Sequence, residues 1–173
     1  MYICTMKFDE AKKTFIQTWG TLGSEWGINR TMAQIHALLL ISPSPVTTDE
    51  IMEELQISRG NANMNLRDLI GWNLIRKELM PADRKEYFVA EKDIWEVARR
   101  IATERKRREI EPVKQVLSKL KLAEGDHKKP EVKEFTKMMS ELEGFVGKMD
   151  KTVDTMIKAD QNWFFGTLIK LMK

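Results

Sequence analysis

Amide and basic side chains gather in one short segment, residues 58–67, which reads S-R-G-N-A-N-M-N-L-R. Asparagine can pair with adenine through two hydrogen bonds and arginine can pair similarly with guanine, each contributing about 1 to 3 kcal/mol of discrimination. Glycine lets the backbone approach a partner closely, and amides in the first turn of a helix can bind a phosphate. These residue types suit recognition of base edges and phosphates. The candidate DNA-binding residues of the segment are Ser58, Arg59, Gly60, Asn61, Asn63, Met64 and Arg67.

A helix that begins after Ser58 would place these residues on one face. Ser58 can cap the helix, and Ile57 before it can pack into the core. Apolar residues recur at i, i+4, i+7 and i+8 and share one buried face: Ala62, Leu66, Leu69 and Ile70. The opposite face then has Gly60, Met64 and Arg67, flanked by Asn61 and Asn63.

The neighbouring elements complete a recognisable order. A short helix precedes the segment, because Thr47 can cap it and Glu50 can reach back to Thr47. A hairpin follows, with strands at 74–80 and 86–90 and a tip at 81–85, where Arg84 and Lys85 are candidate contacts to a phosphate or a minor groove. Two capped helices and a charged hairpin predict a winged helix-turn-helix, which places one helix in the DNA major groove.

The run from about Ile28 to Arg99 resembles the MarR superfamily, and more narrowly its GbsR-like branch. The resemblance depends on I-S-R-G-N-A-N-M-N-L-R-D-L at 57–69 and A-D-R-K-E-Y-F at 82–88. It implies a dimeric transcriptional regulator, often a repressor, in which Asp83 braces the wing and Arg84 contacts DNA. The branch includes regulators of choline and glycine betaine genes, but no ligand motif of that branch is matched here.

A second interpretation uses the same surface for protein contact, because some winged helices are assembly modules that bind no specific DNA. Charge does not choose between the two, since residues 47–91 contain six basic and nine acidic residues, a formal charge of −3. Basic residues concentrate later, at Arg99, Arg100, Arg105, Lys106, Arg107 and Arg108. That run is either a phosphate-binding surface or a solvated helix face with a weak Glu104–Arg108 pair.

The flanking sequence predicts helices, so the expected fold is mainly α with a small β-hairpin wing and N- and C-terminal helical dimerisation extensions. The first helix has an apolar stripe and ends near its glycines, at Gly20, Gly23 and Gly27; the stripe is Phe8, Ala11, Phe15, Trp19 and Leu22. Thr31 and Gln34 can cap the next helix, which runs to about Ser42. The expected division is 1–27, 28–92 and 93–173.

The last third is predicted to be long helices. Asp93 and Glu96 form a capping pair, Pro112 is expected to kink or split the helix it enters, and Pro130 begins another helix. From there a heptad stripe needs a partner, which is an earlier helix or a second copy of the chain; it comprises Val132, Phe135, Met139, Leu142, Val146, Met149, Val153, Met156, Asp160 and Trp163. Gly144 and Gly147 mark a bend or a close crossing. A homodimer would recognise a pseudo-palindromic operator in double-stranded DNA.

A small-molecule effector of cationic or aromatic chemistry is a further hypothesis, because aromatic side chains can form a cage. The candidates are Trp19, Trp26, Trp163 and Phe164. Each lies near an apolar stripe, so packing in the core is the alternative.

Composition indicates an intracellular, cytoplasmic protein: the 173 residues are 42% hydrophobic with a formal charge of +3, and no apolar run is long enough to span a membrane. One cysteine excludes an internal disulfide and a cysteine-cluster metal site. Two isolated histidines, His36 and His127, favour neither catalysis nor metal binding, so no cofactor, no metal and no enzymatic activity are expected.

Overall fold

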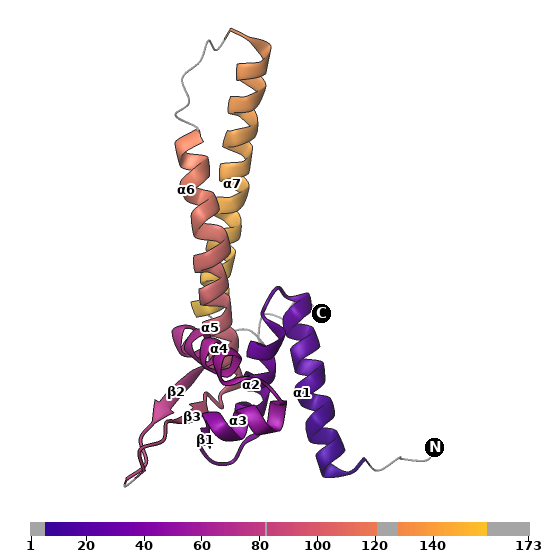
Figure 1. Cartoon of the computed structure of the whole chain (residues 1–173). Coiled ribbons are helices and arrows are strands. Elements are labelled where there is room, and N and C mark those ends of the chain that lie inside the picture. The colour runs from indigo at the N-terminus through magenta and orange to yellow at the C-terminus, as the bar shows by residue number, and fades with distance from the viewer. Residues whose placement is uncertain (1–5, 82, 121–127, 159–173) are drawn as a thin grey trace, which may run out of the picture. The chain divides into compact units, whose positions relative to one another are not determined.

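The computed structural model describes residues 6–81, 83–120 and 128–158 (Figure 1). Contacts divide the chain into two units, an N-terminal unit (Met1–Val97) and a C-terminal unit (Ala98–Lys173). The elements of the first are α1 (Phe8–Glu25), α2 (Arg30–Ile41), β1 (Val46–Thr47), α3 (Thr48–Leu55), α4 (Arg59–Gly71), β2 (Ile75–Glu78) and β3 (Tyr87–Ala90). Then come α5 (Ile94–Arg105), which begins in the first unit, the π-helix η1 (Lys106–Ile110), α6 (Glu111–Leu120) and α7 (Pro130–Lys158). Among the described residues, no helix is long and apolar enough to cross a membrane.

Helix α2 forms the centre of the N-terminal unit, where it packs against α1, α3, α4 and β3. Its apolar residues Met32, Ile35, Leu38 and Leu39 are all buried. The predicted cap was wrong: Asn29 is the N-cap and accepts a hydrogen bond from the Met32 amide at 3.1 Å. Gln34 instead donates from Nε2 to Gln17 Oε1 of α1 at 3.1 Å. The Gln34 side chain, which the local sequence predicted to cap α2, therefore forms a hydrogen bond between α2 and α1.

Helix α1 continues through Gly20 and Gly23 and ends at Glu25, within the glycine-containing stretch where its end was predicted. Both glycines are buried where α1 crosses α2. A Cβ built on Gly23 would lie 2.6 Å from Ala33 Cβ, and one on Gly20 would lie 2.6 Å from Gln34 Cγ. The missing side chains allow the two backbones to approach closely. The face of α1 that packs is therefore Ile16, Gly20 and Gly23, whereas Phe8 of the predicted stripe is 79% exposed.

The sheet has three strands in the order β1-β3-β2, and all neighbours are antiparallel. The predicted hairpin is present with shorter strands, in register Ile75↔Ala90 through Glu78↔Tyr87. Strand β1 was not predicted; its Val46 and Thr47 pair with Phe88 and Tyr87. A two-residue strand has no periodicity of its own, and only its pairing with β3 reveals it.

Lys92 joins the end of the sheet to α2. Its Nζ donates to the carbonyls of Leu39, Leu40 and Ser42 at 2.7 to 2.8 Å. A cation at a helix C-terminus satisfies carbonyls that have no partner within the helix. Burial, and secondarily the charge of Lys92, lowers the pKa of His36 in α2 to about 4. His36 is thus a neutral core residue, and its ring centroid lies 6.3 Å from that of Trp19.

In the C-terminal unit, α5, η1 and α6 follow one another without a break in helical backbone. The predicted effect of Pro112 appears as the π-turn immediately before it, in which Glu111 N donates to Lys106 O. Proline removes one helical donor, and the wider turn keeps the neighbouring groups bonded. Helix α7 begins at Pro130 as predicted, runs continuously through Gly144 and Gly147, and lies antiparallel beside α6 (Figure 1).

Ion pairs in the C-terminal unit join α7 to η1 and α6, and also connect successive turns of α5 and η1. Asp150 of α7, which is buried, pairs with Lys106 of η1 at 3.1 Å and with Lys114 of α6 at 2.5 Å, and these contacts lower its pKa. Glu104 is also buried and binds Arg107 and Arg108, while Arg105 pairs with Glu109 at 2.9 Å. The predicted Glu104–Arg108 pair is therefore present, but its acid is part of the packed interior. Four residues of the basic run, Arg105, Lys106, Arg107 and Arg108, are therefore engaged in ion pairs within the C-terminal unit.

We expect Gly23→Ala to lower the melting temperature. The new methyl group would overlap Ala33 on α2, and overpacking typically costs about 1 to 3 kcal/mol, whereas the gain in helix propensity is at most about 1 kcal/mol. Gly71→Ala is the matched control, because a Cβ at Gly71 has no other atom within 4 Å among the described residues. Thermal unfolding by circular dichroism measures both, and equal stability of the two variants would contradict the close crossing.

Candidate nucleic-acid interface

Two capped helices and a tight turn set the position of the candidate interface. Thr47 and Glu50 form the predicted capping box: Thr47 N donates to Glu50 Oε2 at 2.7 Å and Glu50 N donates to Thr47 Oγ1 at 3.3 Å. Ser58 caps α4 as predicted, accepting from Asn61 N at 3.3 Å. Between them, Gln56 adopts the left-handed conformation at φ 53°, which ends α3 and turns the chain into α4.

Helix α4 has a buried and an exposed side. Ala62, Leu66 and Leu69 are at most 2% exposed, as their spacing predicted. The exposed side presents Gly60, Asn63, Met64 and Arg67, with Arg59 at the beginning of the helix and Asn61 half-buried at the edge. Sequence reasoning missed Asn65, which is completely buried beside Asn61. Asn65 lies three residues after Ala62 and four before Leu69, so the helical spacing already indicated that it could be buried.

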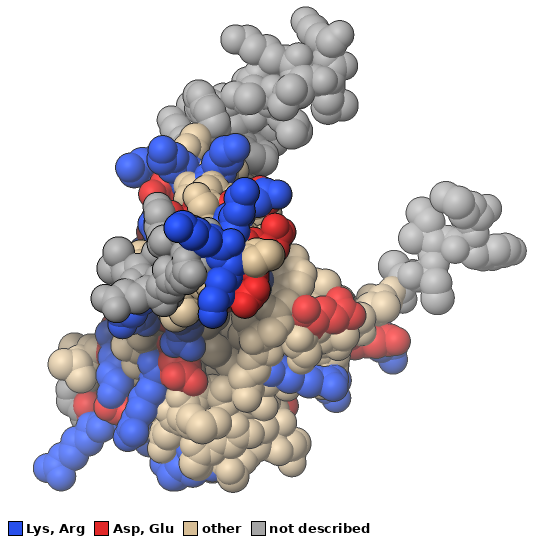
Figure 2. All heavy atoms as spheres, turned by 90° about the horizontal axis from the view of Figure 1, so that it is seen from above, with Lys and Arg blue, Asp and Glu red and all other residues tan. Residues whose placement is uncertain are grey.

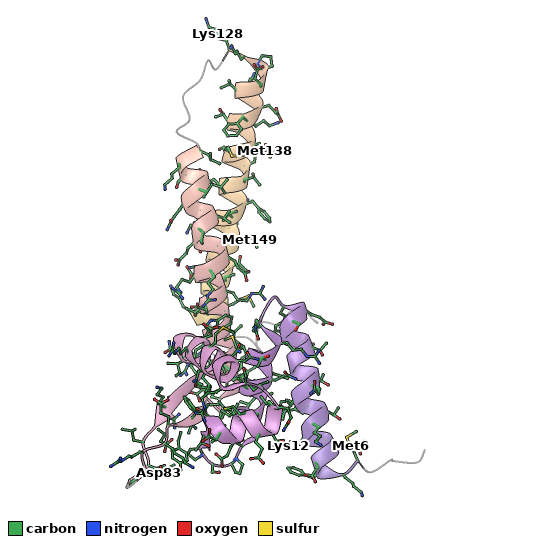
Figure 3. All side chains as sticks on the ribbon, viewed as in Figure 1. Met6, Lys12, Asp83, Lys128, Met138 and Met149 are labelled. Atoms are coloured by element: carbon green, nitrogen blue, oxygen red, sulfur yellow. The ribbon has the colours of Figure 1, made fainter. Side chains whose placement is uncertain are left out.

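The wing is braced by Asp83 at its tip (Figure 3). Asp83 Oδ1 accepts from Lys85 N at 2.9 Å, and Asp83 Oδ2 accepts from the Tyr87 hydroxyl at 2.8 Å. The bond from the Lys85 amide, and then that from Tyr87, lower the pKa of Asp83, while the same contact raises the pKa of Tyr87. Asp83 therefore remains charged and holds the loop in which Arg84 and Lys85 stand exposed.

A polar groove of about 190 Å³ lies between α4 and the wing. Asn63, Arg67 and Ile70 line it from α4, and Lys77 and Glu86 line it from the hairpin. Two of the predicted DNA-binding residues are thus brought beside wing residues that the sequence analysis did not select. Lys77 and Glu86 form an ion pair with each other on the hairpin side of this groove. The α4 face and the hairpin form one continuous surface, so a single duplex can contact both.

Several cations of this surface are already paired with acids. Arg59 pairs with Asp49 of α3, Lys77 with Glu86, and Arg76 more loosely with Glu78 at 3.9 Å. These pairs explain how the segment can be formally acidic and still present basic side chains. Figure 2, a view of the whole molecule from above, shows Lys and Arg beside Asp and Glu. Within the described residues, Arg67, Arg84 and Lys85 are exposed and belong to no ion pair, so they are available to a phosphate or a base.

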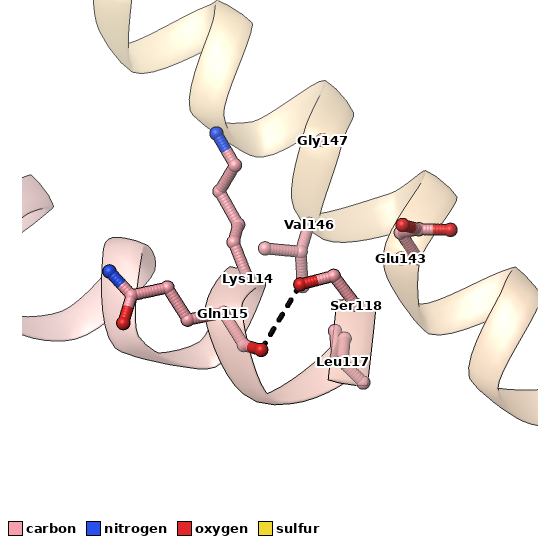
Figure 4. A pocket seen from close by; sticks show the side chains of 7 residues that line it. All are labelled: Lys114, Gln115, Leu117, Ser118, Glu143, Val146 and Gly147. Carbon is pink, nitrogen blue, oxygen red and sulfur yellow. Dashed lines mark hydrogen bonds between the residues drawn. The ribbon is translucent and has the colours of Figure 1, made fainter. Parts of the chain in front are cut away.

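The candidate effector residues do not form a described site. Trp19 is half-buried with its ring 5.5 Å from that of Phe15, Trp26 is 59% exposed, and Trp163 and Phe164 lie outside the described residues. The C-terminal unit has a groove of about 280 Å³ between α6 and α7, lined by Leu117, Ser118, Val146 and Gly147 among others (Figure 4). Across the described residues, no group of three or more His, Cys, Asp or Glu side chains could hold a metal ion.

The helix pair α3 and α4, the wing and the three-stranded sheet together define a winged helix-turn-helix protein. The model of the MarR family matches residues 26–86, which include α2, α3, α4 and β2. A solved structure described as a transcriptional regulator has a TM-score of 0.64 at 17% identity and covers 85% of this chain and 95% of its own, which shows a shared fold. A mutant of S. aureus MepR bound to an oligodeoxyribonucleotide has a TM-score of 0.41 at 17% identity, with coverage of 78% and 94%. No curated protein matches the sequence.

We expect Asp49→Asn to strengthen binding to duplex DNA of any sequence. The substitution removes an acid from the surface and releases Arg59, an exposed residue that can then neutralise one more phosphate. Affinity for a random duplex should rise about two- to tenfold at low salt, and the slope of log affinity against log salt should steepen by about 1.

The matched control is Glu53→Gln, which makes the same charge change at an exposed position of α3. Fluorescence anisotropy at several salt concentrations measures both variants. If Asp49→Asn binds no more tightly than Glu53→Gln, Asp49 does not hold Arg59 away from DNA.

Proposed function

We propose that this protein is a sequence-specific DNA-binding transcription regulator in which α4 enters the major groove and the wing contacts the flanking backbone. The observation that most supports the proposal is the continuous surface of α4 and the hairpin, with Asn63 and Arg67 beside the wing. The MarR-family match over residues 26–86 covers both parts of this surface. Arg67 supplies base or phosphate contacts, and Arg84 and Lys85 supply phosphate or minor-groove contacts.

The regulator acts as a homodimer in this proposal, and an uncovered apolar face on the C-terminal unit supports it. On α7 the face comprises Phe135, Met138, Leu142, Phe145, Met149 and Met156, which are 38 to 60% exposed (Figure 3 labels Met138 and Met149). On α6 it comprises Val113, Val116 and Leu120, which are 39 to 53% exposed. Contiguous exposed apolar surface of this kind marks an interaction site.

Helical geometry places these residues on one side of the α6–α7 hairpin. With 3.6 residues per turn, each apolar stripe lies roughly a third of a turn from the side of its helix that faces the other helix. Viewed from the N-terminus of each helix, the apolar stripe is rotated in the same direction away from the side that faces the other helix. Because α6 and α7 are antiparallel, these two rotations bring both stripes to the same side of the helix pair. Helix α6 therefore covers one edge of the predicted heptad stripe, including Val146, and leaves Phe135, Leu142 and Met149 for a second copy.

Two-fold pairing has a consequence for DNA recognition, because it presents two α4 helices to half-sites about one DNA turn apart. We therefore propose a pseudo-palindromic operator. We propose a repressor, because a dimer bound to such a site near a promoter would block transcription. The wing sequence A-D-R-K-E-Y-F supports assignment to the GbsR-like branch, and release by a small-molecule effector is part of the proposal.

Selection of bound sequences from a random duplex pool tests the function. The expected product is a motif of two inverted half-sites about 10 base pairs apart, and footprinting should show two symmetric protected patches. Binding to a random duplex should be weaker and should fall steeply as salt rises. A single asymmetric patch at saturating protein would contradict the dimeric regulator.

The same experiment distinguishes the alternative function, a winged-helix assembly module. Such a module would enrich no sequence and would show little salt-dependent binding to random duplex. Arg84→Ala and Lys85→Ala separate the contribution of the wing, since loss of phosphate contacts weakens binding across all sequences.

We expect Phe145→Glu together with Met149→Glu to convert the homodimer to a monomer. Two carboxylates in the centre of the apolar face would be buried without partners, which costs far more than the pairing gains. Ser140→Glu is the matched control on the opposite side of α7, where the side chain is exposed. Light scattering should give twice the 20.2 kDa chain mass for the control and 20.2 kDa for the double variant. A monomeric wild type, or a dimeric double variant, would refute this face as the interface.

A further inference from the structure

A buried side chain lies directly behind the candidate recognition surface. Asn65 of α4 is completely buried, which is unusual for an amide in the core of a small domain. Its Nδ2 donates to Asn61 O at 2.8 Å and to Asn61 Oδ1 at 2.7 Å. Its Oδ1 is also buried and accepts no hydrogen bond from the described residues. A leucine of similar shape would fill the same space without a buried unpaired oxygen, so packing alone does not explain an amide here.

The hydrogen bonds determine which way each amide faces. The backbone carbonyl of Asn61 can only accept, so Asn65 must direct its Nδ2 toward Asn61. The second hydrogen of that nitrogen then requires an acceptor, so Asn61 must direct its Oδ1 inward. The Nδ2 group of Asn61 is consequently left facing outward. No described residue accepts a hydrogen bond from it.

From this arrangement we infer that Asn65 is a positioning residue that fixes Asn61 as a hydrogen-bond donor to the DNA major groove. The inference depends on the proposed function, and it gives the two predicted amides different roles. Asn61 offers two donors and favours an acceptor edge, which guanine presents at N7 and O6 and thymine at O4. Asn63 is exposed, and its carbonyl is engaged by no described residue, so it retains the donor and acceptor that adenine requires. Asn61 is thereby excluded from the bidentate adenine pairing that its residue type alone suggests.

The hydrogen bonds between Asn65 and Asn61 restrict the side chain of Asn61, and this restriction would increase sequence specificity. A side chain held by a buried partner loses little conformational freedom on binding, so its contacts contribute more fully to discrimination. Position also supports the assignment, because Asn61 lies in the first turn of α4, the part of a recognition helix that meets base edges.

The test compares Asn65→Leu, Asn61→Ala and the double variant with the wild type on the selected operator. The base pair that Asn61 reads is the one whose preference is lost in Asn61→Ala, and it should have guanine or thymine facing the helix. We expect Asn65→Leu to lose about tenfold discrimination at that pair alone, with affinity for random duplex and melting temperature close to wild type. In the Asn61→Ala background, Asn65→Leu should cause no further loss of discrimination.

Three results would overturn the inference. Full discrimination in a folded Asn65→Leu variant would show that Asn61 needs no positioning, and an equal further loss in the Asn61→Ala background would show that Asn65 acts through the structure of α4 generally. Should Asn65→Leu fail to fold, hydrogen exchange of side-chain amides in the wild type decides: the Asn65 amide should exchange far more slowly than the exposed Asn63 amide, and equal rates reject the pair. Wild-type protein that binds no duplex would refute the proposed function itself, whatever the exchange rates.

Discussion

Burial of one side of α4 is the constraint on which the rest of the candidate interface depends. Ala62, Leu66 and Leu69 are packed against α2 and α3 at no more than 2% exposure, and each leucine contributes about 1.5 to 3 kcal/mol by leaving water. Because a helix is rigid, fixing this side also fixes the direction of Asn63, Met64 and Arg67. The caps at Thr47 and Ser58 and the left-handed Gln56 set where the helix begins, so recognition chemistry is placed by packing.

Electrostatics in this protein is organised mainly by pairing. In the N-terminal unit, Asp49 and Glu86 hold Arg59 and Lys77, and Asp83 orders the wing through Tyr87 and the Lys85 amide. Few cations then remain to attract phosphates without regard to sequence. In the proposed complex, weak general attraction favours discrimination over affinity, because phosphate contacts contribute affinity and base contacts contribute sequence preference.

The C-terminal unit shows the same use of charge inside a structural element. Lys106 and Lys114 converge on Asp150, and Arg107 and Arg108 converge on Glu104, so much of the basic run stabilises the helices among themselves. The pairs to Asp150 join η1 and α6 to α7, whereas the pairs to Glu104 lie between successive turns of one continuous helical segment. Apolar residues such as Phe145 and Met149 remain exposed, and they form the surface proposed for contact with a second copy.

Local features of the chain were predictable because they depend on residues three or four positions apart. The capping pairs at Thr47 and Ser58, the buried stripe of α4, the start of α7 at Pro130 and the hairpin itself all follow from such spacing, and they are enough to indicate a winged helix. Contacts between segments distant in sequence could not be predicted in this way. Gly23 lies against Ala33 of α2, and β1 exists only through its pairing with β3. Asn29 caps α2 in place of Thr31, while Gln34 donates to Gln17. The sequence by itself determined the elements and the residue types on the recognition surface. Tertiary packing decided which of those side chains are paired, buried or turned outward, because these properties depend on neighbours that only the folded chain brings together.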